Sequence, residues 1–585
     1  MAGENGIGSI LVVDCGTVMT RAMLLDGVRG EYRFVAQGEA STTWGKSSAD
    51  ITSGVRHAVK QISDVTGRRF FDENGDLISP QATWQQGVDA FAVTVSASEP
   101  LQLAVGGLGR NLSIASARRA AAGTYAQIKT FLNDNRGIPL TDEACARAIR
   151  NAAPDVVCIA GGTEGGADRP VLDMVKAATL ACSMMDQQAR PAIVYAGNSR
   201  LRKQVAEIIG DEAELRVVEN VRPTLEREYL ADAQQELESL FVQRKLKQLP
   251  GVTSLSNWSP VPVAPTAQAF GRLIQYLWHL GDPEKGVLGV DVGGSNTTIA
   301  AVFDAQLHLT TLSGLGAAFG AKELLRSKDS ETVTRWLPEP LSYDETQSVL
   351  INKETHPTSI PQVEHELWLE HAVAREAIRE VLKIARPAWE PGSAQIYSDL
   401  MPACDTIVIG GGTLAKAPRP GQAALILLDA LQPIGISTLV MDAYGLTPAL
   451  GNVARIKPVA SVEALDAGGL TNLGTVIAPV GKAKPGDSVL KMKVSYDNGN
   501  ELEVEVHYGD LEVLPLPLGQ EAVIELAPRR GFDVGAGAKG ESSKRRVSGG
   551  LAGLIIDARG RPLRLPQERE QRQEQMKQWL REAGG

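Results

Sequence analysis

The hydrophobic pattern of the chain falls into two stretches of similar order and a tail of different character. Near the start, apolar runs separated by polar turns predict three strands and then a helix that ends at Gly67: strands 10–14, 20–26 and 31–37, helix 49–65. From residue 287 strand, turn and strand return, and strands then alternate with helices: strands 405–409 and 438–442, helices 316–327, 362–386 and 420–432. This alternation predicts an α/β fold made of two duplicated lobes, 1–282 and 283–469.

The first lobe is longer than the second and holds further elements. A polar cluster at 72–76 predicts a hairpin turn. Beyond it the pattern predicts strands at 92–95, 102–105, 155–160 and 192–198, and helices at 115–130, 199–209, 223–249 and 266–280. The last helix ends at Gly281-Asp282-Pro283, which marks the boundary between the lobes. No short tandem repeat is present, so the duplication is of whole lobes.

The tail after residue 469 predicts a β-rich domain, 470–565, with its own core. Strands at 489–494 and 502–506 flank the turn Asp497-Asn498-Gly499-Asn500, and a further strand follows at 553–557. Lys544-Arg545-Arg546 is interpreted as a mobile basic loop, which either docks an acidic partner or is merely solvated. Residues 566–585 have the charge density of a solvated helical tail. The domain either recognises a partner or packs against the second lobe.

Two strand exits, far apart in the chain, share one sequence pattern. Asp14-Cys15-Gly16-Thr17 ends the apolar run from Ile10, and Asp291-Val292-Gly293-Gly294-Ser295 ends the run from Leu288. An aspartate at the end of a strand holds a hydrated Mg²⁺, the glycines let backbone N–H groups approach phosphate, and the hydroxyls donate hydrogen bonds. Two such hairpins facing each other would grip a polyphosphate from both sides, although one Asp-x-Gly turn alone is usually only a turn.

A third strand, 406–409, ends in Gly410-Gly411-Gly412-Thr413, where bare backbone can approach a nucleoside. The order of these motifs resembles that of the actin, hexokinase and heat-shock-chaperone ATPase superfamily, in which ATP lies between two ribonuclease H-like lobes. In that resemblance Asp14 to Thr20 looks like the phosphate-1 motif and Asp291 to Thr298 like phosphate-2. The remaining motifs correspond to connect-1 with Gly161, Gly162 and Glu164 in 156–166, adenosine at 410–413, and connect-2 at 444–453.

Further stretches narrow the resemblance to the MutL accessory proteins associated with adenosylcobalamin-dependent glutamate mutase. They are Ser96 to Leu101 with Val105 to Leu108, Arg335 to Pro338, Asn352-Lys353 with Pro357 and Pro361, and Pro418 to Gln422. The resemblance covers residues 8 to 460, and the tail departs from it. It implies an ATP-binding, slowly hydrolysing accessory protein, chaperone-like or reactivase-like, whose client is a subunit of a cobalamin-dependent mutase.

The resemblance also implies roles for individual residues. Asp14 and Asp291 would act through the water shell of Mg²⁺, and the phosphate contacts would come from Gly16, Thr17, Gly293, Gly294 and Ser295. Either Glu164 or Asp291 would orient or deprotonate the attacking water. A small-molecule kinase and an actin-like scaffold remain alternatives. For the kinase, residues 40–150 contain no clear catalytic base, although Asp89 and Glu99 remain candidates.

The composition of the chain limits the classes of partner and the location that are expected. The 585 residues allow three or four domains, and the net charge of −10 argues against nucleic acid, which needs a basic surface. The five cysteines are scattered and are expected to be small core residues rather than disulfides or metal ligands. Neither a basic-then-apolar leader before Ile10 nor an apolar run of membrane length is present, so no membrane contact and a cytoplasmic location are expected.

Overall fold

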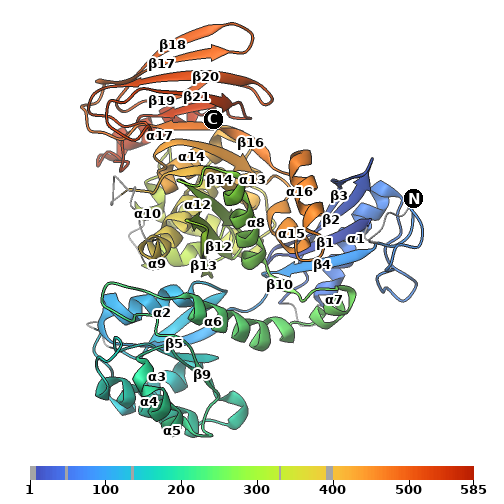
Figure 1. Ribbon diagram of the computed structural model, residues 1–585, viewed down its shortest axis with the longest axis vertical. Helices are drawn as coiled ribbons and strands as arrows, with labels where there is room; N and C mark the ends of the chain where they lie inside the picture. The colour runs from blue at the N-terminus through green and yellow to red at the C-terminus, as the bar shows by residue number, and fades with distance from the viewer. Residues whose placement is uncertain (1–7, 46–49, 134–136, 328–330, 390–399, 585) are drawn as a thin grey trace.

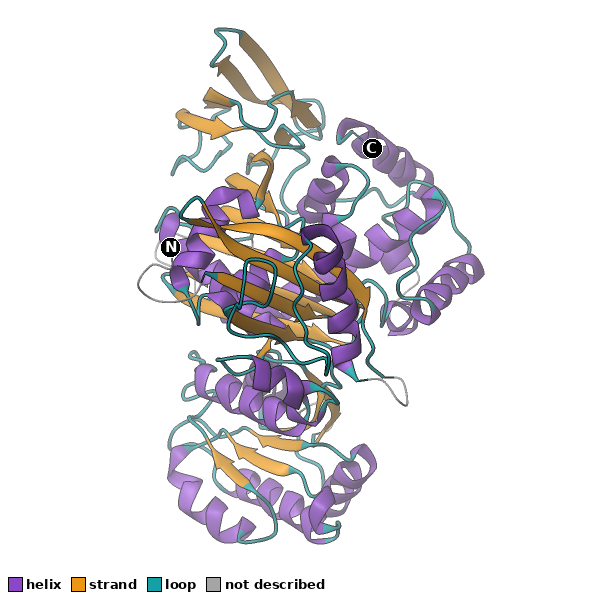
Figure 2. Ribbon diagram, turned by 90° about the vertical axis from the view of Figure 1, so that its right-hand side faces the viewer, coloured by secondary structure: helices purple, strands orange, loops and turns teal. Residues whose placement is uncertain are grey.

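The computed structural model describes residues 8–45, 50–133, 137–327, 331–389 and 400–584. Two α/β lobes lie in the middle, with a smaller α/β domain at one end and an antiparallel sheet at the other (Figure 1). Figure 2 shows the same arrangement from the side, with helices on both sides of the central strands. None of the helices in these ranges is long and apolar enough to cross a membrane. The five cysteines are free and buried, as expected of core residues.

The first lobe is built on a five-stranded sheet in the order β10-β4-β1-β2-β3. Its strands are β1 (Ser9–Cys15), β2 (Met19–Val28), β3 (Glu31–Ser41), β4 (Ala90–Val95) and β10 (Ala264–Pro265). Strand β1 is antiparallel to β2 and parallel to β4, which is parallel to β10. Helix α1 (Ile51–Thr66) begins where Asp50 accepts a hydrogen bond from the backbone N–H of Thr52, and it ends at Gly67 with φ +69°. The predicted start of this helix, residue 49, lies outside the described residues.

The second lobe repeats this order as β13-β12-β11-β14-β15. The strands are β11 (Gly286–Val292), β12 (Asn296–Phe303), β13 (Gln306–Ser313), β14 (Cys404–Gly410) and β15 (Gly435–Met441). Again the first strand is antiparallel to the second and parallel to the fourth. The same strand order and directions in both lobes confirm the predicted fold, a duplicated ribonuclease H-like architecture of the actin-like type. The helices of this half are α9 (Ala321–Ser327), α10 (Glu331–Thr334), α11 (Tyr343–Thr355), α12 (Glu364–Ala385), α13 (Gly412–Ala415), α14 (Pro420–Leu431), α15 (Leu446–Val453) and α16 (Pro458–Ala464).

Two helices cross between the lobes. Helix α8 (Thr266–Leu280) leaves the first sheet at β10 and packs Phe270 and Ile274 into one core with strands of the second lobe. In the other direction, α15 packs on the first sheet, where Leu450 shares a core with strand β1. The helices touch at Gly451, because a Cβ there would lie 1.9 Å from the carbonyl oxygen of Ala269. Each lobe is therefore packed against one helix that belongs to the other half of the chain.

A complete domain is inserted into the first lobe between β4 and β10. Its parallel sheet has the order β6-β5-β7-β8-β9, with helices on both faces. The strands are β5 (Leu101–Gly106), β6 (Ala126–Phe131), β7 (Val156–Ile159), β8 (Ala192–Tyr195) and β9 (Leu215–Val217). The helices are α2 (Ile114–Ala121), α3 (Asp142–Ala152), α4 (Arg169–Ser183), α5 (Arg202–Ile209) and α6 (Ala231–Arg244), and α7 (Val252–Trp258) leads back to β10.

The sequence prediction of this insertion needs two corrections. The helix expected at 115–130 ends at Ala121, and the stretch from Ala126 is strand β6, because the chain turns at Gly123 and then pairs with β5. The helix expected at 223–249 is shorter, since α6 spans Ala231–Arg244 only. From Ala126 the residues alternate between partly buried and exposed positions, as in a strand. The stretch 223–230 precedes helix α6.

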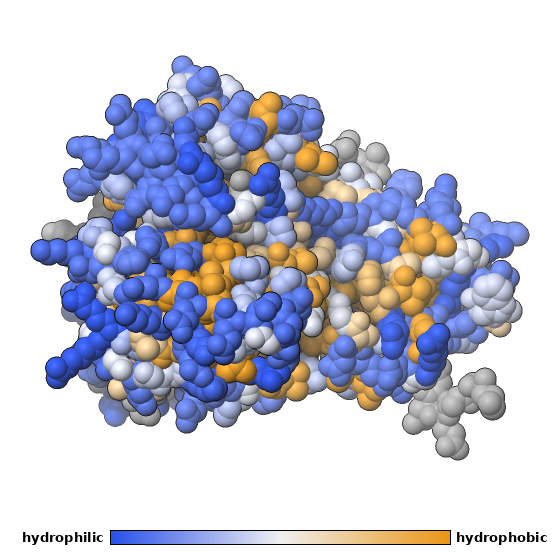
Figure 3. All heavy atoms as spheres, turned by 90° about the horizontal axis from the view of Figure 1, so that it is seen from above, coloured by the Kyte–Doolittle hydropathy of each residue, from blue (hydrophilic) through white to orange (hydrophobic). Residues whose placement is uncertain are grey.

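The expectation of a separate domain from residue 470 holds only in part, because the sheet of the second lobe runs through that position. Strand β16 (Thr471–Ala478) pairs antiparallel with β15, and β22 (Leu554–Asp557) and β19 (Leu511–Leu514) extend the sheet to eight strands. The other strands of the tail form a second sheet, β18 (Glu501–His507), β17 (Ser488–Tyr496), β20 (Glu521–Pro528) and β21 (Ser543–Ser548). This sheet shares a hydrophobic core with Ile477 of β16 and with Leu554 and Ile556 of β22. Seen from this end of the molecule, hydrophilic residues cover most of the surface (Figure 3).

Two further expectations for the tail are wrong. Lys544, Arg545 and Arg546 belong to strand β21, where Lys544 pairs with Glu525, rather than to a mobile loop. Helix α17 (Arg569–Glu582) is not a solvated helix, because Met576 and Trp579 are buried in the core of the second lobe. Most of its charged residues are exposed, but Arg572 is buried and donates to the carbonyl oxygens of Pro566 and Gln567.

We expect truncation after residue 469 to give no soluble, folded fragment. The cut removes β16 and exposes the edge of β15, together with the core that Leu473, Val476 and Trp579 complete. Soluble yield and circular dichroism of the 1–469 fragment measure this. A folded fragment with the melting temperature of the full chain would show that the eight-stranded sheet is not one cooperative unit.

Candidate functional site

A large cavity lies between the two lobes, with a volume of about 1040 Å³. Its walls include the turns at the ends of β1, β11 and β14, which are the three glycine-rich strand exits of the sequence. The sequence-predicted residues that line it are Asp14, Gly16, Thr17, Asp291, Gly293, Gly294, Gly411 and Gly412. The duplicated fold therefore brings together strand exits that are far apart in the chain.

The first two exits have the same turn geometry and face each other. The N–H of Gly16 donates to the carbonyl oxygen of Met19 at 3.0 Å, and that of Gly293 donates to Asn296 at 2.9 Å, three residues on in both cases. Opposite each other, the turns meet at Gly294, where a Cβ would lie 2.3 Å from Val18 Cγ2. Any side chain at position 294 would push the hairpins apart.

The carboxylate of Asp14 lies at the end of β1, buried and held by two hydroxyls. Thr94 and Thr266 each donate to its Oδ1 at 2.7 Å. Burial raises the pKa of Asp14 above its ordinary value, while these hydrogen bonds and the charge of Arg21 lower it. Thr266 opens helix α8, so the helix that connects the lobes also positions the first aspartate.

Asp291 occupies the matching position in the second lobe. Burial and the charge of Asp14 raise its pKa to about 7, although Arg21 opposes them. The third exit passes close beside it, since a Cβ on Gly410 would lie 3.0 Å from Asp291 Oδ1. Gly411 has φ +90°, and a Cβ there would lie 2.1 Å from the carbonyl oxygen of Val292. The glycines of this turn are needed for its close approach to the second aspartate.

Sequence reasoning missed several residues of the site. Arg21 faces Asp14 across the β1–β2 pair, and Glu39 faces Arg21 across β2–β3. Asp442, after β15, accepts hydrogen bonds from the N–H groups of Leu446 and Thr447 at 2.7 Å, and burial raises its pKa. The hairpin register would have found Arg21, because residues that pair across an antiparallel hairpin point to the same face of the sheet.

The connect-1 assignment is wrong. Gly161, Gly162 and Glu164 follow β7 in the inserted domain and are not among the described residues that line the cavity. The Glu164 carboxylate accepts hydrogen bonds from the backbone N–H and hydroxyl of Ser199 and from Asn220. In the first lobe, strand β10 at the edge of the sheet and helix α8 after it occupy the place expected for the connect-1 motif. A glycine-rich loop after a buried strand occurs in any parallel sheet, and this one belongs to the insertion.

Three other predicted residues lie beside the cavity without lining it. Thr20 is buried, and its hydroxyl shares a 2.9 Å hydrogen bond with that of Thr42. Ser295 is in the second turn, where its carbonyl oxygen accepts from the N–H of Gly314. Gly410 provides room for Asp291, as described above. The expected connect-2 segment does reach the cavity through Gly445 and Pro448.

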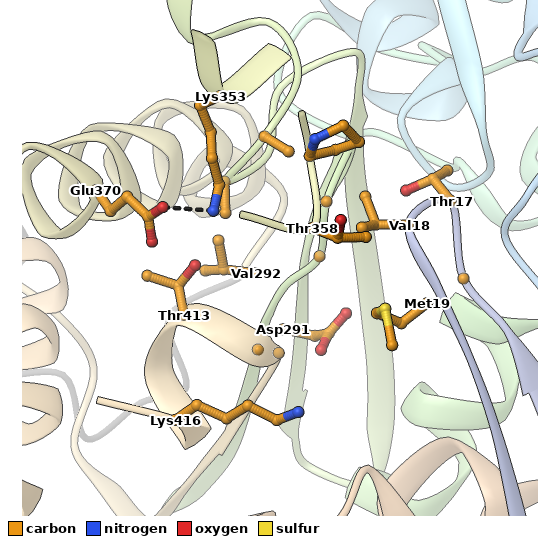
Figure 4. A pocket seen from close by; sticks show the side chains of 18 of the residues that line it. Thr17, Val18, Met19, Asp291, Val292, Lys353, Thr358, Glu370, Thr413 and Lys416 are labelled. Carbon is orange, nitrogen blue, oxygen red and sulfur yellow. Dashed lines mark ion pairs between the residues drawn. The ribbon is translucent and has the colours of Figure 1, made fainter. Parts of the chain in front are cut away.

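Helices α11 and α12 form the far wall of the cavity. Lys353 Nζ lies 2.5 Å from Glu370 Oε1, and the two side chains point toward each other (Figure 4). The adjacent His371 is buried, which lowers its pKa to about 3 and keeps its ring neutral. Stretches that carry the family resemblance meet here, since Ser96, Lys353, Pro357, Pro361 and Pro418 all line the cavity.

A direct metal cage is not built into the described part of the chain. No group of three or more His, Cys, Asp or Glu side chains there is arranged to hold a metal ion. Asp14 and Asp291 are suited to a different mode, in which Mg²⁺ keeps several waters and is held by one or two carboxylates.

Solved structures with similar folds share little sequence with the chain. A glycerol dehydratase reactivase is 11% identical, with 77% of this chain and 100% of that chain covered and a TM-score of 0.31. A nucleotide-free acetone carboxylase is 11% identical over 86% and 81%, with a TM-score of 0.31. The activator of 2-hydroxyisocaproyl-CoA dehydratase from Clostridium difficile, with bound ADPNP, is 10% identical over 78% and 96%, with a TM-score of 0.27.

None of the curated proteins compared with the chain matches it. The sequence model of the family described as "MutL protein" matches residues 10–467, which is most of the chain and includes both lobes and the inserted domain. The chain therefore belongs to the MutL protein family.

Proposed function

We propose that the chain binds Mg²⁺-ATP between its lobes and works as a slowly hydrolysing, ATP-driven accessory protein. The observation that carries this proposal is the pair of Asp-x-Gly turns with the same hydrogen bond, facing each other across one cavity beside a third glycine turn. Glycine turns of this kind leave backbone N–H groups open to phosphate oxygens. A single such turn would carry no functional argument.

The residues present fit Mg²⁺-ATP. In this proposal Gly16, Thr17, Gly293 and Gly294, with Ser295 behind them, would contact the phosphates, and the nucleoside would lie against Gly411, Gly412 and Thr413. The cavity of about 1040 Å³ is at the upper end of the range for small-molecule sites. Asp14 and Asp291 would hold Mg²⁺ through its waters, and the ion would neutralise charge on the phosphates.

Asp291 is the better of the two expected candidates for the catalytic base. Its pKa of about 7 suits a carboxylate that accepts a proton at neutral pH. Glu164, the other candidate, lies in the inserted domain with its carboxylate engaged by Ser199 and Asn220. Arg21, beside both aspartates, would keep part of the Asp291 population ionised.

The crossing of α8 and α15 links the cavity to the rest of the molecule, so that closure around a nucleotide would move one lobe against the other. Such a motion changes the surface offered to a client protein. Membership of the MutL family and the resemblance to glutamate mutase accessory proteins point to a subunit of a cobalamin-dependent mutase as the client, in the cytoplasm.

Asp89 and Glu99, the two candidates for the catalytic base of a kinase, do not line the cavity. Asp89 accepts hydrogen bonds from the N–H groups of Gly8 and Ser9, at the opposite end of β1, and Glu99 is exposed. We therefore expect slow ATP hydrolysis that a purified cobalamin-dependent mutase accelerates, and that small alcohols, sugars and carboxylic acids do not. Phosphate release with and without each addition measures this. A phosphorylated small molecule formed in equal amount with ADP would replace the accessory role with a kinase.

A further inference from the structure

One ion-paired cluster bridges the two lobes at the cavity. Glu39, on β3 of the first lobe, accepts a hydrogen bond from Arg21 Nε at 2.8 Å. It accepts another at 2.6 Å from Nζ of Lys416, which follows α13 in the second lobe. Burial raises the pKa of Glu39, but the two cations outweigh it and hold the pKa below its usual range. One carboxylate thus joins a cation from each lobe.

Both cations line the cavity, and Arg21 faces Asp14, at the first of the predicted phosphate turns, across the β1–β2 pair. Arg21 reaches from the first lobe to turns of the second, since its guanidinium lies within 3.9 Å of a Cβ built on Gly412 and 3.3 Å of one built on Gly445. Lys416 extends its ammonium group toward the side of the cavity where Asp291 and Met19 lie (Figure 4).

The duplication shows that this cluster is not needed to build the sheet. The second lobe has the same row of paired positions, in which Asp291 faces Thr298 and Thr298 faces Thr311. The two threonines share a 3.1 Å hydrogen bond where the first lobe has Arg21 and Glu39. Because an uncharged pair of threonines occupies the same position in the second sheet, we look for a role of Arg21 and Glu39 other than stabilising the sheet.

The charge balance of the cavity indicates that role. Its described lining includes seven carboxylates, Asp14, Glu39, Asp291, Glu339, Glu364, Glu370 and Asp442, but only three fixed cations, Arg21, Lys353 and Lys416. Lys353 is paired with Glu370 inside the second lobe. A polyphosphate entering this acidic site therefore has Arg21 and Lys416 to attract it, and Glu39 competes for both.

We propose that Arg21 and Lys416 are the cations that receive the phosphates, and that Glu39 is an interlobe latch which the phosphates displace. The proposal rests on nucleotide binding at this site. Phosphate contact at Lys416 breaks its pair with Glu39, so binding at the cavity changes a contact between the lobes. Glu39 then influences both the affinity for nucleotide and the relative position of the lobes without nucleotide.

Two variants with opposite expected effects test the latch. Glu39→Gln removes the competitor, so Mg²⁺-ATP should bind roughly fivefold more tightly. Lys416→Met removes a phosphate partner, so binding should weaken roughly tenfold. Both variants break the pair between the lobes and should broaden the interlobe distance without nucleotide, measured between spin labels at Lys60→Cys and Lys383→Cys, two exposed positions in α1 and α12.

Glu501→Gln is the matched control, because Glu501 pairs with Lys493 at 2.9 Å on the exposed C-terminal sheet, away from the cavity. It should change neither affinity nor distance. Weaker ATP binding in Glu39→Gln would overturn the latch and leave Glu39 a structural residue, and so would an unchanged interlobe distance in both cavity variants. If the parent protein binds no Mg²⁺-ATP, the proposed function fails, whereas the distance measurement still decides whether Glu39 joins the lobes.

Discussion

Replacing Asp14 or Asp291 by Asn should abolish the rise in melting temperature that Mg²⁺-ATP gives to the parent protein. Both carboxylates line the cavity at the ends of matching strands, and a neutral amide would lose the attraction for the metal's water shell. We expect affinity to fall at least roughly 100-fold. At ligand concentrations about 100 times Kd, the parent should gain about 2.7 kcal/mol from binding, and the variants almost nothing. Thermal melts with and without Mg²⁺-ATP measure the difference.

The pH dependence of the same variants provides the control. The pKa of Asp291 is about 7 in the folded protein, above its ordinary value of 3.8, so the fold favours the protonated acid. Without nucleotide, its contribution to stability therefore falls as pH rises toward 7 and is lost above that pH. Asp291→Asn should remove this loss and melt a few degrees higher than the parent at pH 8. The parent's Mg²⁺-ATP affinity should increase from pH 6 to pH 8, because binding needs the ionised carboxylate. A variant that still responds to Mg²⁺-ATP as the parent does would show that the metal is held elsewhere.

Arg559→Met should cause a large loss of stability, although Arg559 lies outside the cavity. Arg559 is fully buried and donates to Asp557 at 2.9 Å and to Asp429 at 2.8 Å, and its guanidinium lies 4.5 Å from the ring centroid of Trp579. These residues join β22, α14 and α17, so the network ties the end of the chain to the second lobe. Its removal leaves two buried carboxylates short of a partner, which costs about 3 kcal/mol even though Arg561 and Arg375 remain.

The pKa of Asp557 adds a pH signature to this prediction. Burial raises that pKa, but Arg559 and Arg561 outweigh burial and hold it well below the ordinary value. The stability it contributes is therefore present at neutral pH and is lost only in strong acid. The urea midpoint, followed by tryptophan fluorescence, measures the loss at pH 7. Arg545→Met is the matched control, because Arg545 is exposed on β21 and its removal should change stability by less than about 0.5 kcal/mol. Equal midpoints for the two variants would mean that the buried network adds nothing.

Local signals in the sequence were enough to find both Asp-x-Gly hairpins. The turn at Gly16 and the turn at Gly293 each close with a hydrogen bond between residues three apart, so the information lies within a few positions. The run of three glycines at 410–412 was visible in the sequence, whereas its close approach to Asp291 and Val292 is a contact of the tertiary structure. The motif order and the strand alternation then indicated a duplicated fold, which the matching sheet orders confirm.

Contacts between distant segments were decided only by the tertiary structure. Glu39 and Lys416 are 377 residues apart, and neither has a local pattern that marks it as a partner of the other. Glu164 looked like a cleft residue because its glycine loop follows a buried strand, yet the loop belongs to an inserted parallel sheet with strand exits of its own. Strands β16, β19 and β22 lie in the β-rich tail of the sequence but extend the sheet of the second lobe. The physical reason is the same in each case. Turn geometry and alternation are fixed by neighbours in the chain, whereas strand pairing and ion pairing across a cleft depend on which surfaces the whole fold brings together.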